Sequence, residues 1–194
     1  MINLNENYWT DRYRNGYTGW DIGHASPPLK QYLDQIGDRN CSILIPGAGN
    51  GYEAAEGFHM GFSNIHLLDI SRIPLQRFSE KFPDFPQEQI YHEDFFQHQG
   101  KYDLILEQTF FCALDPSVRV EYCEKMKELL KPNGKLVGVL FGIEFERSGP
   151  PFGGKIADYQ VLFEQYFEIK KLEPCYNSIP PRMGSEVFIH LVNQ

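Results

Sequence analysis

Three apolar runs of the sequence end in residues that could bind a small ligand. The first continues as Ile45-Pro46-Gly47-Ala48-Gly49-Asn50-Gly51-Tyr52-Glu53. Its glycines allow a tight turn and a close approach of a ligand to the backbone, ahead of a helix N-terminus. The spacing lacks the third glycine of the GxGxxG dinucleotide motif, and the lysine of a phosphate-binding P-loop is absent. The segment therefore indicates a ligand-binding turn, with a purely structural turn as the alternative.

The other two runs end in carboxylates. They read Leu67-Leu68-Asp69-Ile70-Ser71 and, further along, Glu93-Asp94-Phe95-Phe96. Asp69 could accept hydrogen bonds from both ribose hydroxyls of an adenosine lying across a sheet edge. Asp94 could bind the adenine amino group while Phe95 covers the ring face. The alternatives are a helix-capping aspartate at 69, and a turn followed by a core aromatic at 94 and 95.

The elements that must position these residues alternate along the chain. Apolar runs predict strands at 41–46, 64–70, 89–92, 102–106, 135–141, 167–172 and 186–192. Helical periodicity predicts helices at 51–60, 71–82 with Ser71 as N-cap, 117–130 ending in Lys131-Pro132-Asn133-Gly134, and 156–166. The Gly/Pro-rich stretch 142–154 reads as a long functional loop.

Strand–helix alternation predicts an α/β fold. Right-handed crossovers give a mostly parallel, Rossmann-like sheet of about seven strands, with helices on both faces and an antiparallel hairpin that supplies an antiparallel last strand. Ligands bind beyond the carboxyl ends of such strands, where the three segments above lie. We expect one domain over 1–194, with an N-terminal lid and helix at 1–37 and the core at 38–194.

Composition excludes several classes. The net charge of −8 and the pI near 5.2 argue against a protein that grips nucleic-acid phosphates or an anionic membrane. The N-terminal sequence lacks the apolar run of a signal peptide, and the mostly apolar stretch 136–143 is under half of the roughly 20 residues that span a bilayer. We expect a cytoplasmic protein with neither a membrane nor a nucleic-acid partner.

The cysteines and histidines suggest no metal site. The four cysteines are widely spaced without a CxxC pair, and the six histidines contain no HExxH pair. Buried free thiols and isolated histidines are the expected state. His24, Arg147 and Arg182 are either guides for an anion near a pocket mouth or solvated surface charges.

Taken together, the motifs resemble those of S-adenosylmethionine-dependent methyltransferases of the thiopurine methyltransferase superfamily, in particular its halide and thiol methyltransferases. The resemblance covers nearly the whole chain. It rests on Trp9, Tyr13 and Gly16, Trp20-Asp21-x-Gly23, the glycine turn, Leu68-Asp69-Ile70-Ser71, Glu93-Asp94-Phe95-Phe96, Thr109-Phe110-Phe111-Cys112-Ala113-Leu114-Asp115-Pro116, Leu129-Leu130-Lys131-Pro132-x-Gly134 and Gly149-Pro150-Pro151-Phe152.

The resemblance implies a role for each matched residue towards the cofactor S-adenosylmethionine, whose product is S-adenosylhomocysteine. It places the aromatic residues Trp9, Tyr13 and Trp20 over the cofactor and Gly47, with Gly49 of the same turn, against its methionine part. It makes Asp69, beside Ile70, the ribose ligand, and Asp94 with Phe95 the adenine contacts. It also implies cofactor contacts for two adjacent residues after the fourth strand, Glu107 and Gln108.

The resemblance is weakest at the acceptor. Phe141 stands where the plant enzymes have a tyrosine with an active-site role, and Tyr13 departs from a tryptophan found in them. We therefore expect Phe141 and Tyr13 to shape the reaction pocket. The implied activity is methyl transfer to a small molecule with a soft nucleophile, such as a thiol, sulfide, halide, thiocyanate or thiopurine. A monomer is expected.

Four other functions are weighed on the sequence, and the residues argue against two of them. An NAD-dependent oxidoreductase shares the sheet and an acidic residue after the second strand, but the glycine spacing argues against it. Nucleic-acid amine methyltransferases carry an Asn/Asp-Pro-Pro-aromatic motif where this chain has Glu107-Gln108-Thr109-Phe110. A cofactor-binding module without catalysis, or a methyltransferase for another small-molecule acceptor, is the remaining alternative.

Overall fold

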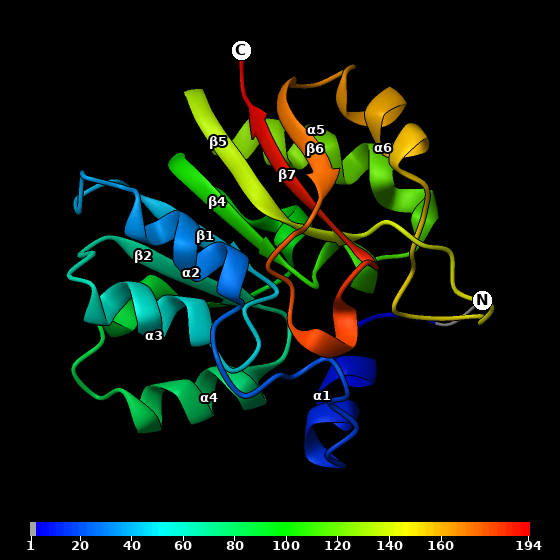
Figure 1. The fold of residues 1–194 in the computed structure, drawn as a ribbon. Helices are drawn as coiled ribbons and strands as arrows, with labels where there is room; N and C mark the ends of the chain where they lie inside the picture. The colour runs from blue at the N-terminus through cyan, green and yellow to red at the C-terminus, as the bar shows by residue number, and fades with distance from the viewer. Residues whose placement is uncertain (1–2) are drawn as a thin grey trace.

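A computed structural model describes residues 3–194 of the chain; residues 1 and 2, counted in the predicted N-terminal segment, lie outside it. A seven-stranded sheet runs in the order β3-β2-β1-β4-β5-β7-β6, with helices against both faces (Figure 1). Strands β1 to β5 pair in parallel, and β7 is antiparallel to both of its neighbours. The predicted α/β, Rossmann-like sheet with an antiparallel last strand is confirmed.

The strands follow the apolar runs of the sequence. All four residues of β1 are buried, as expected of a central strand covered on both faces. The strands are β1 (Ile43–Pro46), β2 (Ile65–Asp69), β3 (Ile90–His92), β4 (Tyr102–Gln108), β5 (Leu130–Phe141), β6 (Glu168–Pro174) and β7 (Glu186–Val192).

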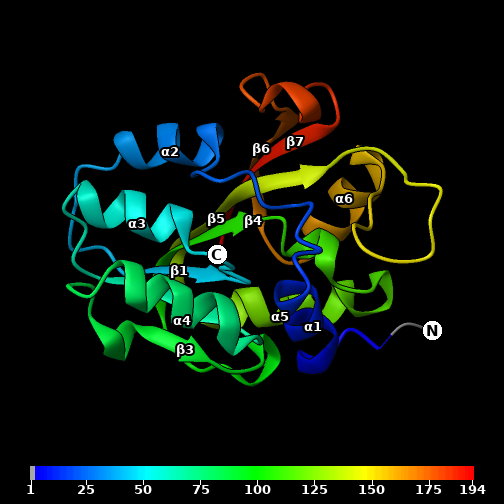
Figure 2. The same ribbon diagram turned by 90° about the horizontal axis from the view of Figure 1, so that it is seen from below.

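The sheet divides the core in two, and each helix buries one apolar stripe against it. The residues of β1 alternate between the cores, with Ile43 and Ile45 in one and Leu44 in the other. Helices α2 (Pro27–Asp34), α3 (Tyr52–His59) and α4 (Arg72–Lys81) cover the first core, and α5 (Arg119–Leu129) and α6 (Ile156–Phe163) cover the second (Figure 2). Short 3₁₀ helices are η1 (Gln87–Gln89), η2 (Phe95–Gln97), η3 (Phe111–Ala113), η4 (Pro116–Val118) and η5 (Pro180–Arg182).

One helix cap and one helix start differ from the sequence prediction. Ser71 stands at the N-cap position of α4, but its side chain makes no capping bond and instead pairs with the hydroxyl of Thr10 at 2.9 Å. Ser117 belongs to η4, where its backbone N–H donates to Asp115, so α5 begins only at Arg119. At Ser71 a long-range hydrogen bond replaces the capping bond that the sequence pattern favours, and at Ser117 a local hydrogen bond forms a short turn ahead of the helix.

The carboxyl ends of the parallel strands point towards helix α1 (Glu6–Arg14) and the 142–154 loop (Figure 2). Helix α1 packs against α4, and its N-cap is Asn5, which accepts from the Tyr8 N–H at 3.1 Å. The chain from α1 to α2 therefore crosses the same sheet edge where the predicted ligand-binding residues lie.

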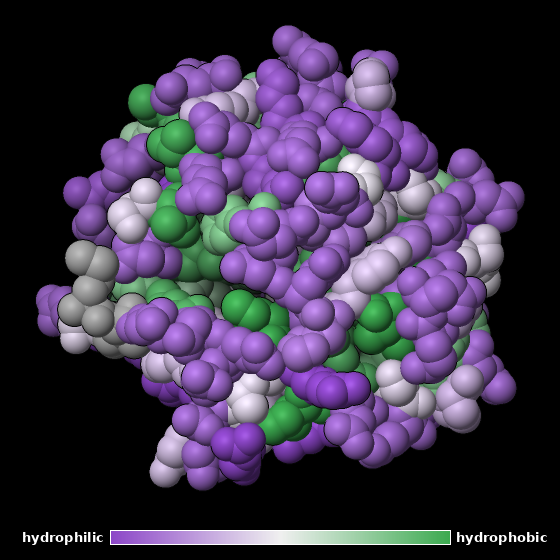
Figure 3. Space-filling model, turned by 180° about the vertical axis from the view of Figure 1, so that it is seen from behind, coloured by the Kyte–Doolittle hydropathy of each residue, from purple (hydrophilic) through white to green (hydrophobic). Residues whose placement is uncertain are grey.

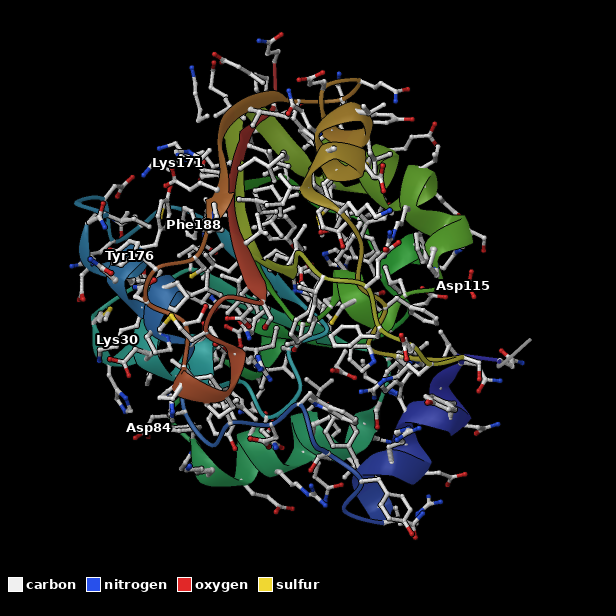
Figure 4. The ribbon with its side chains drawn as sticks, turned by 45° about the vertical axis from the view of Figure 1, so that its right-hand side comes forward. Lys30, Asp84, Asp115, Lys171, Tyr176 and Phe188 are labelled. Carbon is white, nitrogen blue, oxygen red and sulfur yellow. The ribbon has the colours of Figure 1, made fainter. Side chains whose placement is uncertain are left out.

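The β6–β7 hairpin contacts α2, the second helix of the N-terminal region. The hydroxyl of Tyr176 donates to Gln31 of α2 at 2.8 Å, and the ring of Phe188 on β7 lies 6.5 Å from that of Tyr32 (Figure 4). The hairpin thus extends the sheet while its turn is held against α2. Across residues 3–194, every helix is too short or too polar to cross a bilayer.

Candidate active site

A cavity of about 940 Å³ opens at the carboxyl edge of the sheet, between the strand ends, the N-terminal segment and the 142–154 loop. From the side opposite Figure 1, recessed apolar side chains interrupt a mostly hydrophilic surface (Figure 3). A cavity of this size can enclose a nucleoside cofactor together with a small second molecule.

The glycine turn after β1 forms one wall of the cavity. Gly47 and Gly49 have φ of 59° and 54°, a conformation that side-chain-bearing residues rarely adopt. A Cβ on Gly47 would lie 2.4 Å from the ring of Phe110, and one on Gly49 would lie 2.9 Å from the Tyr13 hydroxyl oxygen. The turn therefore needs glycine both for its backbone angles and for the close approach of its neighbours.

Asp69 at the end of β2 is buried and also lines the cavity. One carboxylate oxygen accepts from the Gly49 N–H at 2.9 Å, and the other accepts from the Ser71 N–H at 2.8 Å. Burial raises the pKa of Asp69 to about 6, although both backbone donors oppose the rise. Each oxygen keeps acceptor capacity for a donor in the cavity.

Asp94 and Phe95, which follow β3, line the same cavity, and so does Ile70, which follows β2. One oxygen of Asp94 accepts from the Phe96 N–H at 2.9 Å, and the carboxylate is otherwise exposed. Phe95 is buried, with its ring 5.0 Å from that of Phe110. Asp94 thus offers a free acceptor next to a fixed aromatic surface.

Three aromatic side chains of the N-terminal segment cover the cavity. The ring of Trp20 lies 5.6 Å from the rings of both Trp9 and Tyr13, edge to face in each case. All three line the cavity, and Tyr13 is buried. Burial and the charge of Asp69 raise the pKa of Tyr13, so its hydroxyl stays protonated.

Hydrogen bonds of Asp21 explain the Trp-Asp-x-Gly motif. Asp21 accepts from the amide of Asn50, from the Tyr52 hydroxyl at 3.2 Å and from the Gly23 N–H at 2.7 Å. Asn50 and Tyr52 belong to the glycine turn and to α3. The aspartate therefore fastens the covering segment to the glycine turn, while the preceding tryptophan covers the cavity.

Glu107 differs in position from the other predicted cofactor contacts. Glu107 does not line the cavity; it is fully buried on the α5 side of the sheet. Its carboxylate accepts from the N–H groups of Phe110 and Phe111 at 2.9 and 3.1 Å and from the Tyr122 hydroxyl at 3.0 Å. It thus holds the turn at Thr109, which has a φ of 57°, and acts on the cavity only through that turn.

The adjacent residue, Gln108, does line the cavity. Its side-chain oxygen is buried and has no hydrogen-bond partner in the chain that the structure describes. A buried amide oxygen of this kind is costly unless a ligand supplies a donor. Gln108 is therefore placed to bind a polar hydrogen within the cavity.

The far end of the cavity, beyond β4 and β5, has aromatic walls with a guanidinium group over each ring: the central carbon of Arg182 lies 5.8 Å from the centre of the Phe141 ring, and that of Arg147 lies 5.3 Å from the centre of the Phe145 ring. The ring of Phe141 faces the cavity and lies 5.0 Å from that of Phe145, while the Phe141 carbonyl accepts from the Tyr159 hydroxyl at 2.8 Å. Cys112 also lines this end, and burial together with the charge of Glu107 raises the pKa of its thiol. The thiol therefore stays protonated and acts as an apolar wall.

One charged residue of the cavity, Glu53, could not be recognised from the sequence pattern. Glu53 was seen only as the end of the glycine turn, yet it is buried and lines the cavity. Arg182, one of the three residues considered as anion guides, lines it too and donates to the Trp20 carbonyl at 2.7 Å. No group of three or more His, Cys, Asp or Glu side chains within residues 3–194 is arranged to hold a metal ion.

The cavity suits a nucleoside cofactor that carries its own hydrogen-bond donors. It offers a buried acceptor on Gln108, free acceptors on Asp69 and Asp94, and closely approachable backbone at Gly47 and Gly49. With this sheet order, such an edge defines the class: an S-adenosylmethionine-dependent methyltransferase. The family model "Thiopurine S-methyltransferase (TPMT)" matches residues 4–188. The chain belongs to the thiopurine S-methyltransferase family.

Two relatives agree with this assignment, and a solved structure shares the fold. The chain is 33% identical over 186 residues to "Probable thiol methyltransferase 2" of Arabidopsis thaliana, covering 92% of this chain and 81% of the relative. It is 30% identical over 194 residues to "Thiocyanate methyltransferase 1" of Brassica oleracea, covering 94% and 83%. Magnesium protoporphyrin IX methyltransferase from Synechocystis, solved with bound S-adenosylmethionine, shares the fold at a TM-score of 0.74 and 13% identity, covering 100% of this chain and 99% of that one.

Our first prediction concerns Glu107, whose burial raises its pKa from 4.5 to about 7. The native state holds a proton that the unfolded state has already released, so this group makes stability fall as pH rises through that range. Relative to Glu107→Gln, the parent should lose about 1.4 kcal/mol of unfolding free energy between about pH 6 and pH 8. Urea unfolding at both pH values measures this difference. Glu121→Gln, exposed on α5, is the control; an equal pH dependence in parent and Glu107→Gln would contradict the assignment.

The second prediction concerns the covering segment. Trp20→Ala removes the ring that both Trp9 and Tyr13 contact, so the segment should lose order and cofactor affinity should fall about tenfold. Limited proteolysis with S-adenosylhomocysteine should then cleave residues 3–25 faster than in the parent. Arg14→Ala, exposed on α1, should behave as the parent. Equal protection in Trp20→Ala would show that the ring does not hold the segment.

Proposed function

We propose that the protein methylates a small molecule at a soft nucleophile: a thiol, sulfide, halide, thiocyanate or thiopurine-like sulfur. The observation that carries this proposal is the far end of the cavity, where Phe141, Phe145 and the protonated thiol of Cys112 form apolar walls and the guanidinium groups of Arg182 and Arg147 lie over the two rings. Weakly hydrated nucleophiles lose little on entering such a space, and exclusion of water increases their reactivity. The names of the thiol and thiocyanate methyltransferase relatives support the same acceptor class.

In this proposal the sheet edge holds the donor. Asp69 binds the ribose hydroxyls, Asp94 binds the adenine amino group, and Phe95 with Ile70 covers the adenine. Gly47 and Gly49 let the methionine part lie against the backbone, and Gln108 accepts from a polar hydrogen. When bound, S-adenosylmethionine supplies a methyl group on a positively charged sulfur. The aromatic rings of the covering segment tolerate that charge by cation–π attraction.

The chain's residues then act by positioning. Phe141 and Tyr13 shape the space in which the nucleophile lies in line with the methyl–sulfur bond, and Trp9 and Trp20 exclude water above it. In-line displacement between held partners gains mainly from proximity and orientation. The nucleophile's electron pair forms the new bond to the methyl carbon as the bond to the donor sulfur breaks.

Proton removal is left to the acceptor's own chemistry. Phe141 has no hydroxyl, and burial raises the pKa values of Tyr13 and Cys112, so neither is a base near neutral pH. Thiocyanate and iodide need no deprotonation. A neutral thiol must ionise first, so its methylation should increase with pH towards its own pKa.

The donor assignment predicts the effect of Asp69→Ala. Loss of the carboxylate leaves the ribose hydroxyls without an acceptor and should weaken S-adenosylmethionine binding at least about tenfold, or about 1.4 kcal/mol. Isothermal titration calorimetry measures it. Asp84→Ala, on the exposed surface away from the sheet edge, is the control (Figure 4). Unchanged affinity in Asp69→Ala would refute the ribose assignment.

The acceptor class is tested by S-adenosylhomocysteine formation. We expect turnover with at least one of iodide, thiocyanate, hydrosulfide, an aromatic thiol or a thiopurine, and a rate that increases with pH only for acceptors that must lose a proton. Each acceptor is assayed at two pH values on either side of its pKa. If all of them fail while the cofactor still binds in calorimetry, the soft-nucleophile proposal is wrong and another small-molecule acceptor must be sought.

A further inference from the structure

Glu53 is a buried carboxylate without a cation. The residue is 5% exposed. One of its two carboxylate oxygens accepts a hydrogen bond from the Ser26 N–H at 2.8 Å. No Lys, Arg or His nitrogen within residues 3–194 lies within 4 Å of it. A carboxylate held in this way is costly unless a positive group reaches it. Because Glu53 lines the cavity, that group can come from the ligand.

Arg182 faces the same cavity with the opposite charge. One terminal nitrogen donates to the Trp20 carbonyl at 2.7 Å, and the other contacts buried Glu186 at 3.3 Å. These two bonds use two of the five N–H groups of a guanidinium, and the other three make no hydrogen bond within residues 3–194. The guanidinium carbon also lies 5.8 Å from the centre of the Phe141 ring. The positive charge of Arg182 also acts on Glu53, where it opposes the rise in pKa that burial causes.

The position of the pair relative to Asp69 defines which part of the cofactor they meet. Asp69 lies on one side of the glycine turn, bonded to Gly49. Glu53 lies in the first turn of α3, just past the turn, and Arg182 approaches from η5 beneath the Trp20 carbonyl. Asp69, the glycine turn, Glu53 and Arg182 all line one cavity, so a cofactor with its ribose on Asp69 can run its chain along the turn towards these two charges.

We propose that Glu53 and Arg182 bind the zwitterionic end of the cofactor's methionine part, Glu53 its α-ammonium and Arg182 its α-carboxylate. The ammonium supplies the missing cation of Glu53, and a charge-assisted hydrogen bond in a buried site is about twice as strong as a neutral one. Arg182 bonds the covering segment and the cofactor together, so binding of the amino-acid end stabilises the closed position of Trp20. This inference concerns the donor and is independent of the acceptor.

The test compares two ligands by calorimetry. S-adenosylhomocysteine carries the amino-acid end, and 5′-methylthioadenosine has the same nucleoside and sulfur without it. The parent should bind the first at least about tenfold more tightly. Glu53→Gln, which keeps the acceptor for Ser26, and Arg182→Met should each weaken S-adenosylhomocysteine about tenfold and change 5′-methylthioadenosine by less than about twofold.

Further arms separate the two residues and control for folding. The S-adenosylhomocysteine analogue without its amino group should bind equally to the parent and Glu53→Gln, and the analogue without its carboxylate should bind equally to the parent and Arg182→Met. Glu56→Gln, on the next turn of α3 and paired with Lys30, and Arg72→Met, exposed on α4, should match the parent throughout. Unaltered binding of 5′-methylthioadenosine shows that each variant keeps its cavity.

Three results would overturn the proposal. One is a parent that binds both ligands equally well. Another is a variant that weakens both ligands by the same factor, which would give Glu53 or Arg182 a structural role only. The third is unchanged S-adenosylhomocysteine affinity in Glu53→Gln. Each is distinct from a failure of the acceptor assay, which leaves these affinities untouched.

Discussion

The hydrogen bond from the Gly49 N–H to the buried Asp69 carboxylate fixes the geometry of the cavity. It joins the ends of β1 and β2 and holds the glycine turn in a left-handed conformation with its backbone facing the cavity. The same carboxylate accepts from Ser71, whose hydroxyl meets Thr10 of α1. Burial raises the pKa of this carboxyl group to about 6, and the two backbone donors oppose the rise. The group is therefore mostly ionised at pH 7 and can accept hydrogen bonds from a ligand.

The covering segment depends on several weak attachments rather than on a core of its own. Thr10 meets Ser71, the Tyr13 carbonyl accepts from Arg77 at 3.2 Å, and the Trp20 carbonyl accepts from Arg182. Asp21 adds bonds to the glycine turn. Contacts of this kind each contribute about 1 kcal/mol, so the segment can open at modest cost while the sheet below stays fixed.

The alternation of apolar runs and helical periodicity was sufficient to predict the sheet, its helices and the strand ends where the cavity lies. Local sequence patterns could not predict the contacts of a side chain whose partner lies far away in the sequence. Ser71 bonds Thr10, and Glu53 and Arg182 line the same cavity only because the fold brings them there, so their spacing in the sequence carries no signal. Glu107 is different, because in a strand it shares a face with Ile105, which packs under α5. Strand alternation could therefore have placed Glu107 away from the cavity and Gln108 towards it.

The most direct test of the whole account is a crystal structure of the protein with bound S-adenosylhomocysteine. The account predicts the ribose hydroxyls on Asp69, the adenine between Asp94 and Phe95, the α-ammonium within hydrogen-bonding distance of Glu53, and Trp20 closed over the sulfur. An amino-acid end directed away from Glu53, or a ribose that does not contact Asp69, would contradict it.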